Sequence, residues 1–121
     1  MSSSHRTRVA VIGGLSRAGD LWTRAGDALG VDLEHHDGRI RGRGFGEISS
    51  AVRRADVVVI ITDPNSHGGV SAARRAAVAH DRPHTLVKRL RPSDLAGVIA
   101  EIQAVERAKT AVARPAPRIA S

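Results

Sequence analysis

The sequence predicts an α/β fold in which helices cover both faces of a parallel, four-stranded sheet. Short runs of β-branched residues alternate four times with segments of helical periodicity. The links between these segments are short, as they are in right-handed strand–helix–strand crossovers. One run, Val57–Ile61, is apolar at every position, which is typical of a central parallel strand that is buried on both faces.

The first strand and the first helix lie on either side of a glycine pair. Arg8–Ile12 is a short apolar run that predicts a strand and stops at Gly13-Gly14. Residues 18–29 then carry apolar side chains at the spacing of one helix face, and Gly30 follows at a C′ position. These apolar positions are Ala18, Leu21, Trp22, Ala25 and Leu29.

The next strand leads into two adjacent histidines. Val31–Glu34 predicts the second strand, which runs into His35-His36. Residues from about Glu47 to Ala55 repeat the helical spacing and predict the second helix, with apolar positions Ile48, Ala51, Val52 and Ala55. Val57–Ile61 is the third strand.

Each of the last two helices follows a serine, a residue type favoured at the N-cap because its oxygen accepts a free backbone N–H. Ser66 precedes a helix with the apolar positions Val70, Ala73, Ala77 and Val78. Thr85–Lys88 predicts the fourth strand. Ser93 precedes the fourth helix, whose apolar stripe is Leu95, Val98, Ile99, Ile102 and Val105.

Together these elements predict a small Rossmann-like, or flavodoxin-like, three-layer sandwich with the strand order 2-1-3-4. We expect one domain over residues 8–109, because a chain of 121 residues is long enough to bury a core without disulfides. Residues 1–7 are expected to be a flexible N-terminus. Residues 110–121, rich in Ala, Pro and Arg, are expected to be a disordered tail.

The composition restricts the classes of function. The chain has no cysteine, which excludes disulfides and thiolate metal sites. Its net charge is +7, with 17 Arg and 2 Lys, which suggests an anionic partner or an arginine-rich solvated surface. Trp22 and Phe45 are the two aromatic residues, too few for a platform that stacks nucleic-acid bases. Without a signal peptide or a membrane span, we expect a cytoplasmic protein.

Polar residues gather where the predicted strands end. In an open α/β sheet, ligands bind outside the carboxyl ends of the strands, at the point where the strand order reverses. Here that point lies between the first and third strands. The candidate ligand-binding residues are Gly13, Gly14, Ser16, Asp37, Arg39, Asp63, Ser66 and Lys88. We expect Gly13, Gly14 and Ser16 to donate hydrogen bonds to an anion, and Arg39 and Lys88 to pair with its charge.

Three histidines on the same edge are candidate metal ligands. His35 and His36 are adjacent in a strand and therefore point to opposite faces, so one of them can face the crevice, and the sequence leaves open which. Together with His67 and a carboxylate they could hold a metal ion, act as an acid–base set, or supply an axial ligand to haem. Asp63 could fix a histidine tautomer.

The arginines divide into two groups. Arg39, Arg41 and Arg43 alternate with glycines in a loop that could close over a phosphate or contact a nucleic-acid backbone. The second group lies on outer helix faces and is interpreted as solvated charge: Arg53, Arg54, Arg74 and Arg75.

The motifs resemble a widespread bacterial family of small proteins known as a domain of unknown function. The resemblance covers about residues 8–100. It is carried by Val11-Ile12-Gly13-Gly14, His35-His36-Asp37-Gly38, Ala55-Asp56 before an apolar strand, and Asp63-Pro64-Asn65-Ser66-His67. The resemblance implies a Rossmann-like fold and a shared site formed by Gly13, Gly14, His35, His36, Asp37, Asp63, Ser66 and His67. Members of the family often carry a cysteine after the Ser-His pair, and this chain has none.

Four hypotheses of function follow. The first is a non-catalytic, regulatory module that holds a small anionic ligand or a metal complex and reports its presence through the Arg/Gly loop. The second is a metal or haem protein that uses His35 or His36 together with His67, which the resemblance also favours. The third is a basic nucleic-acid adaptor, and the fourth is a small hydrolase or transferase. A homodimer is expected because a small sheet has exposed edges.

Overall fold

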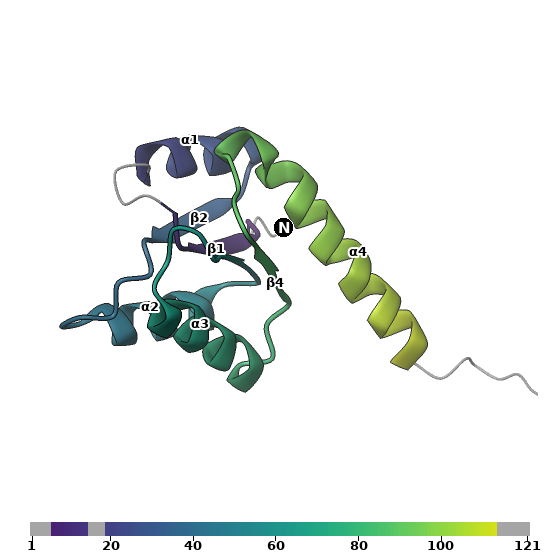
Figure 1. Ribbon diagram of the computed structural model, residues 1–121. Helices are drawn as coiled ribbons and strands as arrows, with labels where there is room; N and C mark the ends of the chain where they lie inside the picture. The colour runs from purple at the N-terminus through teal and green to yellow at the C-terminus, as the bar shows by residue number, and fades with distance from the viewer. Residues whose placement is uncertain (1–5, 15–18, 114–121) are drawn as a thin grey trace, which may run out of the picture.

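The computed structural model describes residues 6–14 and 19–113 (Figure 1). Four parallel strands form one sheet in the order β2-β1-β3-β4, as predicted. The strands are β1 (Arg8–Ile12), β2 (Asp32–His36), β3 (Val57–Ile61) and β4 (His84–Val87). The order reverses between β1 and β3, so the predicted switch point is present.

The helices form the two outer layers of the predicted sandwich (Figure 1). They are α1 (Gly19–Leu29), α2 (Gly44–Arg54), α3 (His67–Ala79) and α4 (Leu95–Ala113), with a short 3₁₀ turn, η2 (Pro92–Asp94), before α4. Helices α1 and α4 cover one face of the sheet, and α2 and α3 cover the other.

The core consists of branched residues that alternate between these two faces. Ile12 and Ile60 are buried against α2 and α3, whereas Val59 and Ile61 are buried against α1 and α4. All five residues of β3 are buried, which confirms the prediction of a central strand. Because a buried branched side chain contributes roughly 1.5–3 kcal/mol, β3 is a major source of stability.

Helix α3 packs through small residues. Its buried positions are Gly69, Ala72, Ala73, Ala76 and Ala77. Without long side chains in between, the backbone of α3 can approach both the sheet and α2. Val70 packs at the margin of this core, and the larger side chains Arg74, Arg75 and Val78 are exposed.

Several predicted boundaries differ from the structure. Helix α2 begins at Gly44 rather than near Glu47, because the turn at residues 41–43 already bonds to the helix: Gly44 N–H donates to Arg41 O at 3.0 Å. Ser93 does not precede a helix as its cap, because it lies inside η2. Helix α4 continues through Ala113, so residues 110–113 are helical rather than part of a tail.

Both ends of the predicted domain also shift. Arg6 and Thr7 belong to the ordered domain, because Arg6 Nη2 donates to Val31 O at 2.9 Å and Thr7 O accepts from Asp32 N–H at 2.9 Å. The remaining predicted N-terminal residues, 1–5, and residues 114–121 of the predicted tail lie outside the described residues.

Some predicted apolar positions are exposed rather than buried. In α1, Trp22 is buried but Leu21 and Leu29 are exposed, because this helix turns only a narrow side toward the sheet. Val78 at the end of α3 and Val105 in α4 are also exposed. Both of these valines lie beside β4, where the sheet ends.

Candidate functional site

The loops that follow β1, β2 and β3 contact one another at the carboxyl edge of the sheet, around the side chain of Asn65. We call this set of contacts the interlock. Its Nδ2 donates to Ile61 O at 2.8 Å and to Ile12 O at 3.4 Å. Its Oδ1 accepts from Ser66 N–H at 2.7 Å. One amide side chain thus ties together the ends of β1 and β3 and the start of α3.

The glycine pair after β1 belongs to this interlock and does not present donors to an anion. Gly13 N–H donates to His36 O at 2.7 Å, and Gly14 N–H donates to Pro64 O at 2.8 Å. Both glycines have positive φ angles, +114° and +86°, and a Cβ on Gly13 would overlap the carbonyl oxygen of Ile61. Their role here is structural. Ser16, predicted to assist them, lies outside the described residues.

Ser66 is the N-cap of α3, as predicted. Its Oγ accepts from Gly69 N–H at 2.8 Å and donates to Gly38 O at 2.9 Å. Gly38 has a φ of +91°, and a Cβ there would overlap the Asn65 amide oxygen. The Ser66 hydroxyl therefore joins the loop after β2 to the loop after β3, and no catalytic role is needed to explain it.

His35 and His36 point to opposite faces of the sheet, as predicted. His35 lies on the α1 side, stacked on Trp22 with ring centroids 6.0 Å apart and planes 25° apart. Its Nε2 is 2.7 Å from Gly13 O, so this nitrogen carries the proton and donates. Burial lowers the pKa of His35 below its ordinary value of 6.5, outweighing the hydrogen bond to Gly13 and the Asp37 charge, which raise it.

His36 is held by two hydrogen bonds on the α2 side. Its Nδ1 accepts from Gly38 N–H at 3.0 Å, so its Nε2 carries the proton and donates to Glu47 Oε1 at 3.1 Å. The ring thus links the loop after β2 to the first turn of α2, and both of its nitrogens are engaged within the fold.

The structure does not bring the three histidines together. His35 faces α1, His36 faces α2, and His67 is the first residue of α3. Over residues 6–14 and 19–113, no group of three or more His, Asp or Glu side chains has the arrangement of a metal site. Among the described residues, the metal hypothesis therefore has no ligand set of three such side chains.

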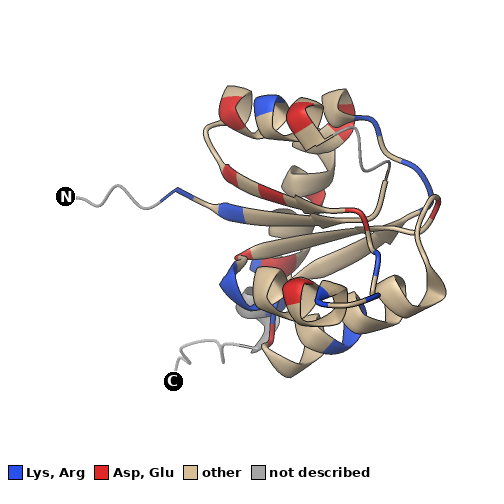
Figure 2. Cartoon of the chain, turned by 90° about the vertical axis from the view of Figure 1, so that its left-hand side faces the viewer, with Lys and Arg blue, Asp and Glu red and all other residues tan. Residues whose placement is uncertain are grey.

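The charged candidates form ion pairs in the loops at this edge. Figure 2 marks Lys and Arg in blue and Asp and Glu in red along the chain. Arg39 Nη2 lies 3.0 Å from Asp37 Oδ2, and Arg89 Nη2 lies 3.1 Å from Asp63 Oδ2. Partial burial would raise the pKa of Asp37, but the Arg39 N–H and guanidinium together with His36 hold it below its ordinary value of 3.8. Lys88 is exposed, and its carbonyl oxygen accepts from Asp63 N–H at 2.9 Å.

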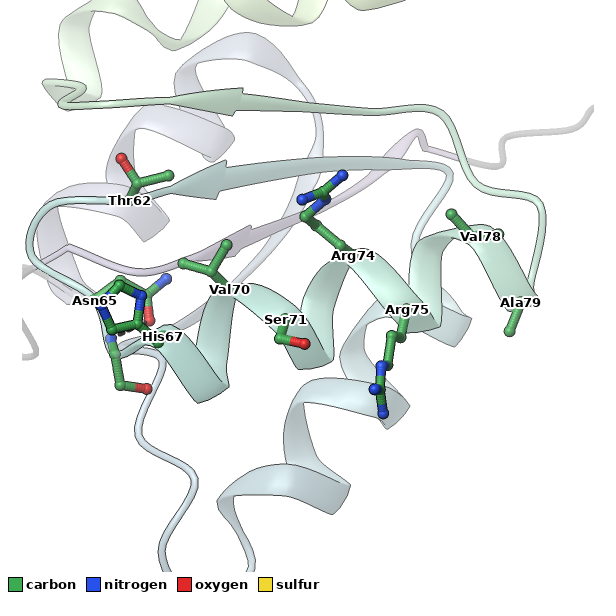
Figure 3. A pocket seen from close by; sticks show the side chains of 10 residues that line it. Thr62, Asn65, His67, Val70, Ser71, Arg74, Arg75, Val78 and Ala79 are labelled. Atoms are coloured by element: carbon green, nitrogen blue, oxygen red, sulfur yellow. Dashed lines mark hydrogen bonds between the residues drawn. The ribbon is translucent and has the colours of Figure 1, made fainter.

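A groove of about 850 Å³ runs along the outward flank of α3, beginning at the carboxyl end of β3 (Figure 3). Its lining carries two arginines, a histidine, hydroxyl groups and apolar side chains. The lining residues are Thr62, Asn65, Ser66, His67, Val70, Ser71, Arg74, Arg75, Val78 and Ala79. Of the predicted site residues, Ser66 and His67 border this groove.

Arg74 and Arg75 are groove residues that sequence reasoning alone interprets as solvated charge. They lie seven and eight residues after His67, which places them on the same helix face as His67 and Ser71. That spacing is the signal that could have identified them. An exposed face that begins at a cap on the carboxyl edge and carries two arginines predicts an anion groove better than either arginine alone.

Fold and site define a small Rossmann-like α/β protein with a basic groove beside the carboxyl edge of its sheet. The chain belongs to the family described as uncharacterized protein conserved in bacteria (DUF2325), whose profile matches residues 8–102.

Among curated proteins, none matches this chain. Among solved structures, a similar chain is the Trypanosoma brucei CTPS glutaminase domain with bound acivicin, at 22% sequence identity and a TM-score of 0.44. The alignment covers 66% of this chain and 35% of that chain, so the protein spans about a third of the length of this structural neighbour.

No helix in the described part of the chain combines the length and the apolar character needed to cross a membrane. This includes α4, which has 19 residues but carries charged side chains such as Glu101, Glu106 and Arg107 along its length.

Proposed function

We propose that the protein is a non-catalytic module that binds a small anionic ligand in the groove along α3. One observation carries the proposal: the ten residues that line the groove include Arg74, Arg75 and His67 but no Asp or Glu. At the neighbouring loops, by contrast, Arg39 and Arg89 are each paired with an aspartate. The groove thus offers positive charge that its own lining does not neutralise.

The chemistry of the groove suggests a ligand with an anionic group and an apolar part. A guanidinium can bind a phosphate or a carboxylate through two parallel hydrogen bonds. Figure 3 shows Val70 and Arg74 on the side of α3 that faces the strands, with Thr62 at the end of β3. Val70 and Val78 supply apolar surface, and a volume of about 850 Å³ is within the usual range for small-molecule sites.

Binding without catalysis is supported by the hydrogen bonds of two candidate catalytic groups, the Ser66 hydroxyl and the His36 ring. The Ser66 hydroxyl is engaged by Gly69 N–H and Gly38 O, and both nitrogens of His36 are engaged by Gly38 and Glu47. A nucleophile or a general base needs a group that can reach a substrate. These groups instead hold the groove's scaffold in place.

A thermal-shift and calorimetric screen tests the proposal. The probes are inorganic pyrophosphate, nucleoside mono- and diphosphates, and dicarboxylates of two to six carbons. A ligand that binds only the folded state at 100 times its Kd stabilises it by about 2.7 kcal/mol. We expect at least one probe to bind, with a Kd raised tenfold or more by Arg74→Gln.

The matched control is Arg24→Gln, which removes the same charge from an exposed position on α1, away from the groove. Its Kd should stay within twofold of that of the original chain. Absence of binding by every probe, or equal losses in the two variants, would overturn the proposal. Tight binding of DNA or RNA that falls steeply with salt would favour the nucleic-acid hypothesis in its place.

A further inference from the structure

Within the described ranges of the chain, the outer strand β4 pairs with β3 on one side and has no strand partner on the other. Val58 N–H donates to Pro83 O at 2.9 Å and Thr62 N–H donates to Val87 O at 2.8 Å, so odd-numbered residues of this segment bond to β3. The N–H and C=O of one strand residue point to the same side. Those of His84 and Leu86 therefore point away from β3, toward the open edge of the sheet.

Apolar side chains surround this open edge. Val78 of α3 is 71% exposed, Leu86 of β4 is 40% exposed and Val105 of α4 is 55% exposed. A cavity of about 490 Å³ extends between α3, the start of β4 and α4, and both Val78 and Val105 line it. An edge strand bordered by apolar groups on both faces of the sheet is a template for pairing with another strand.

Helix α4 extends beyond the body that it packs against. Among its side chains described through Lys109, the last buried one is Ile102, and the helix continues through Ala113. Figure 1 shows it running past the β4 side of the sheet, with its last turns clear of the remaining elements. Since a short helix in water gains little stability without tertiary packing, this extension indicates a further contact surface.

The two ends of the edge carry opposite charge. Near the start of β4, three carboxylates accompany two cations: Asp81, Glu101 and Glu106 with Arg82 and Lys109. Just after β4, Lys88, Arg89 and Arg91 accompany Asp63 and Asp94. A two-fold axis across the strand would bring the start of one copy to the end of the other. The same surface is then complementary to itself.

We propose that the edge of β4 is the dimer interface of this protein, and that its occupant is a second copy of the chain. The two β4 strands pair antiparallel across a two-fold axis, which makes one sheet of eight strands. His84 of one copy lies opposite Leu86 of the other, because this register pairs all the outward N–H and C=O groups of both residues. Thr85 then faces Thr85 of the second copy.

Cross-linking tests both the interface and its register. Residues at such a two-fold position have Cα atoms about 4.5 Å apart, within the range for a disulfide. The chain has no cysteine, so Thr85→Cys introduces a single thiol. We expect mild oxidation to convert most of this variant to a covalent dimer. The control Thr23→Cys, on exposed α1 surface, should remain largely uncross-linked.

Sedimentation of the full chain between 1 and 100 μM tests the contact itself. We expect twice the chain mass of 12.8 kDa, and at least a tenfold higher dimer Kd for Leu86→Lys and for Val105→Glu. Leu21→Lys alters an exposed leucine on α1, away from β4, and should remain dimeric. Circular dichroism verifies that each variant is folded.

A monomer at 100 μM, or a dimer that neither edge variant weakens, would overturn this proposal. A dimer that resists cross-linking at Thr85→Cys would overturn the register. None of these results depends on binding in the groove along α3, so the two proposals fail separately.

Discussion

The Nε2 of His35 lies 2.7 Å from the carbonyl oxygen of Gly13, the residue that follows β1. This bond joins the end of one strand to a ring that also stacks on Trp22. The imidazole is therefore part of the packing between the sheet and α1, and its neutral form is the one that the fold accommodates.

This contact predicts a loss of stability in mild acid. Since the pKa of His35 is lowered in the folded chain, the unfolded chain takes up the proton first as the pH falls. The contribution of His35 to the free energy of unfolding is thus complete above pH 6.5 and is lost as the pH falls through the folded pKa. Urea titrations at different pH values, followed by the fluorescence of Trp22, the single tryptophan, measure this free energy of unfolding.

In His35→Phe this part of the pH dependence should disappear, whereas His67→Gln should keep it because His67 is exposed at the start of α3. Equal slopes between pH 7.5 and pH 5 for His35→Phe and the original chain would contradict the assignment.

Gly38→Ala is expected to destabilise the fold by about 2–3 kcal/mol. The residue has a φ of +91°, and an added Cβ would overlap the amide oxygen of Asn65. Gly42→Ala is the matched control, because Gly42 also has a positive φ, +61°, but nothing described beyond its chain neighbours lies within 4 Å of its Cβ position. Chemical denaturation of both variants separates the effect of the contact from that of the backbone. Equal losses would show that the contact with Asn65 contributes nothing.

Ser66→Ala should lower the free energy of unfolding by about 1–2 kcal/mol, because it removes both the cap of α3 and the donor to Gly38 O. Ser71→Ala, at an exposed position of the same helix, should change it by less than about 0.5 kcal/mol. Thermal and urea unfolding provide the comparison. A Ser66→Ala variant as stable as Ser71→Ala would remove the capping role.

Gly97→Ala should raise the free energy of unfolding by about 0.5–1 kcal/mol. Gly97 lies in the first turns of α4 and is exposed, and nothing described outside its own stretch of helix backbone lies within 4 Å of the point that an added Cβ would occupy. The substitution adds no contact and reduces the backbone freedom of the unfolded chain. A decrease in the urea midpoint would indicate that this part of α4 needs a flexible residue.

Local patterns predict the scaffold because each depends on neighbours in the chain. Five consecutive branched residues specify the buried strand Val57–Ile61, and a serine before a helical repeat specifies the cap at Ser66. The end of α4 lies later than predicted, because the segment after residue 109 combines the composition of a tail with alanines that favour helix.

The candidate site is harder to predict because its contacts join distant segments. Asn65 bonds to Ile12 O, 53 residues away, and Ser66 bonds to Gly38 O, 28 residues away. No local pattern shows that these partners meet, so polar residues that build the scaffold resemble residues that bind a ligand. The sequence predicts the region of the site but not which of its residues are structural and which line the groove.

The interlock around Asn65 has a consequence for how the protein can diversify. It relies on backbone groups and on two small polar side chains, and Ser71, Arg74 and Arg75, which are exposed, are not part of it. Mutations at these three exposed positions can therefore alter the charge and shape of the groove without disturbing the interlock. Evolution or protein engineering can thus change which ligands the groove binds while the fold of the protein stays the same.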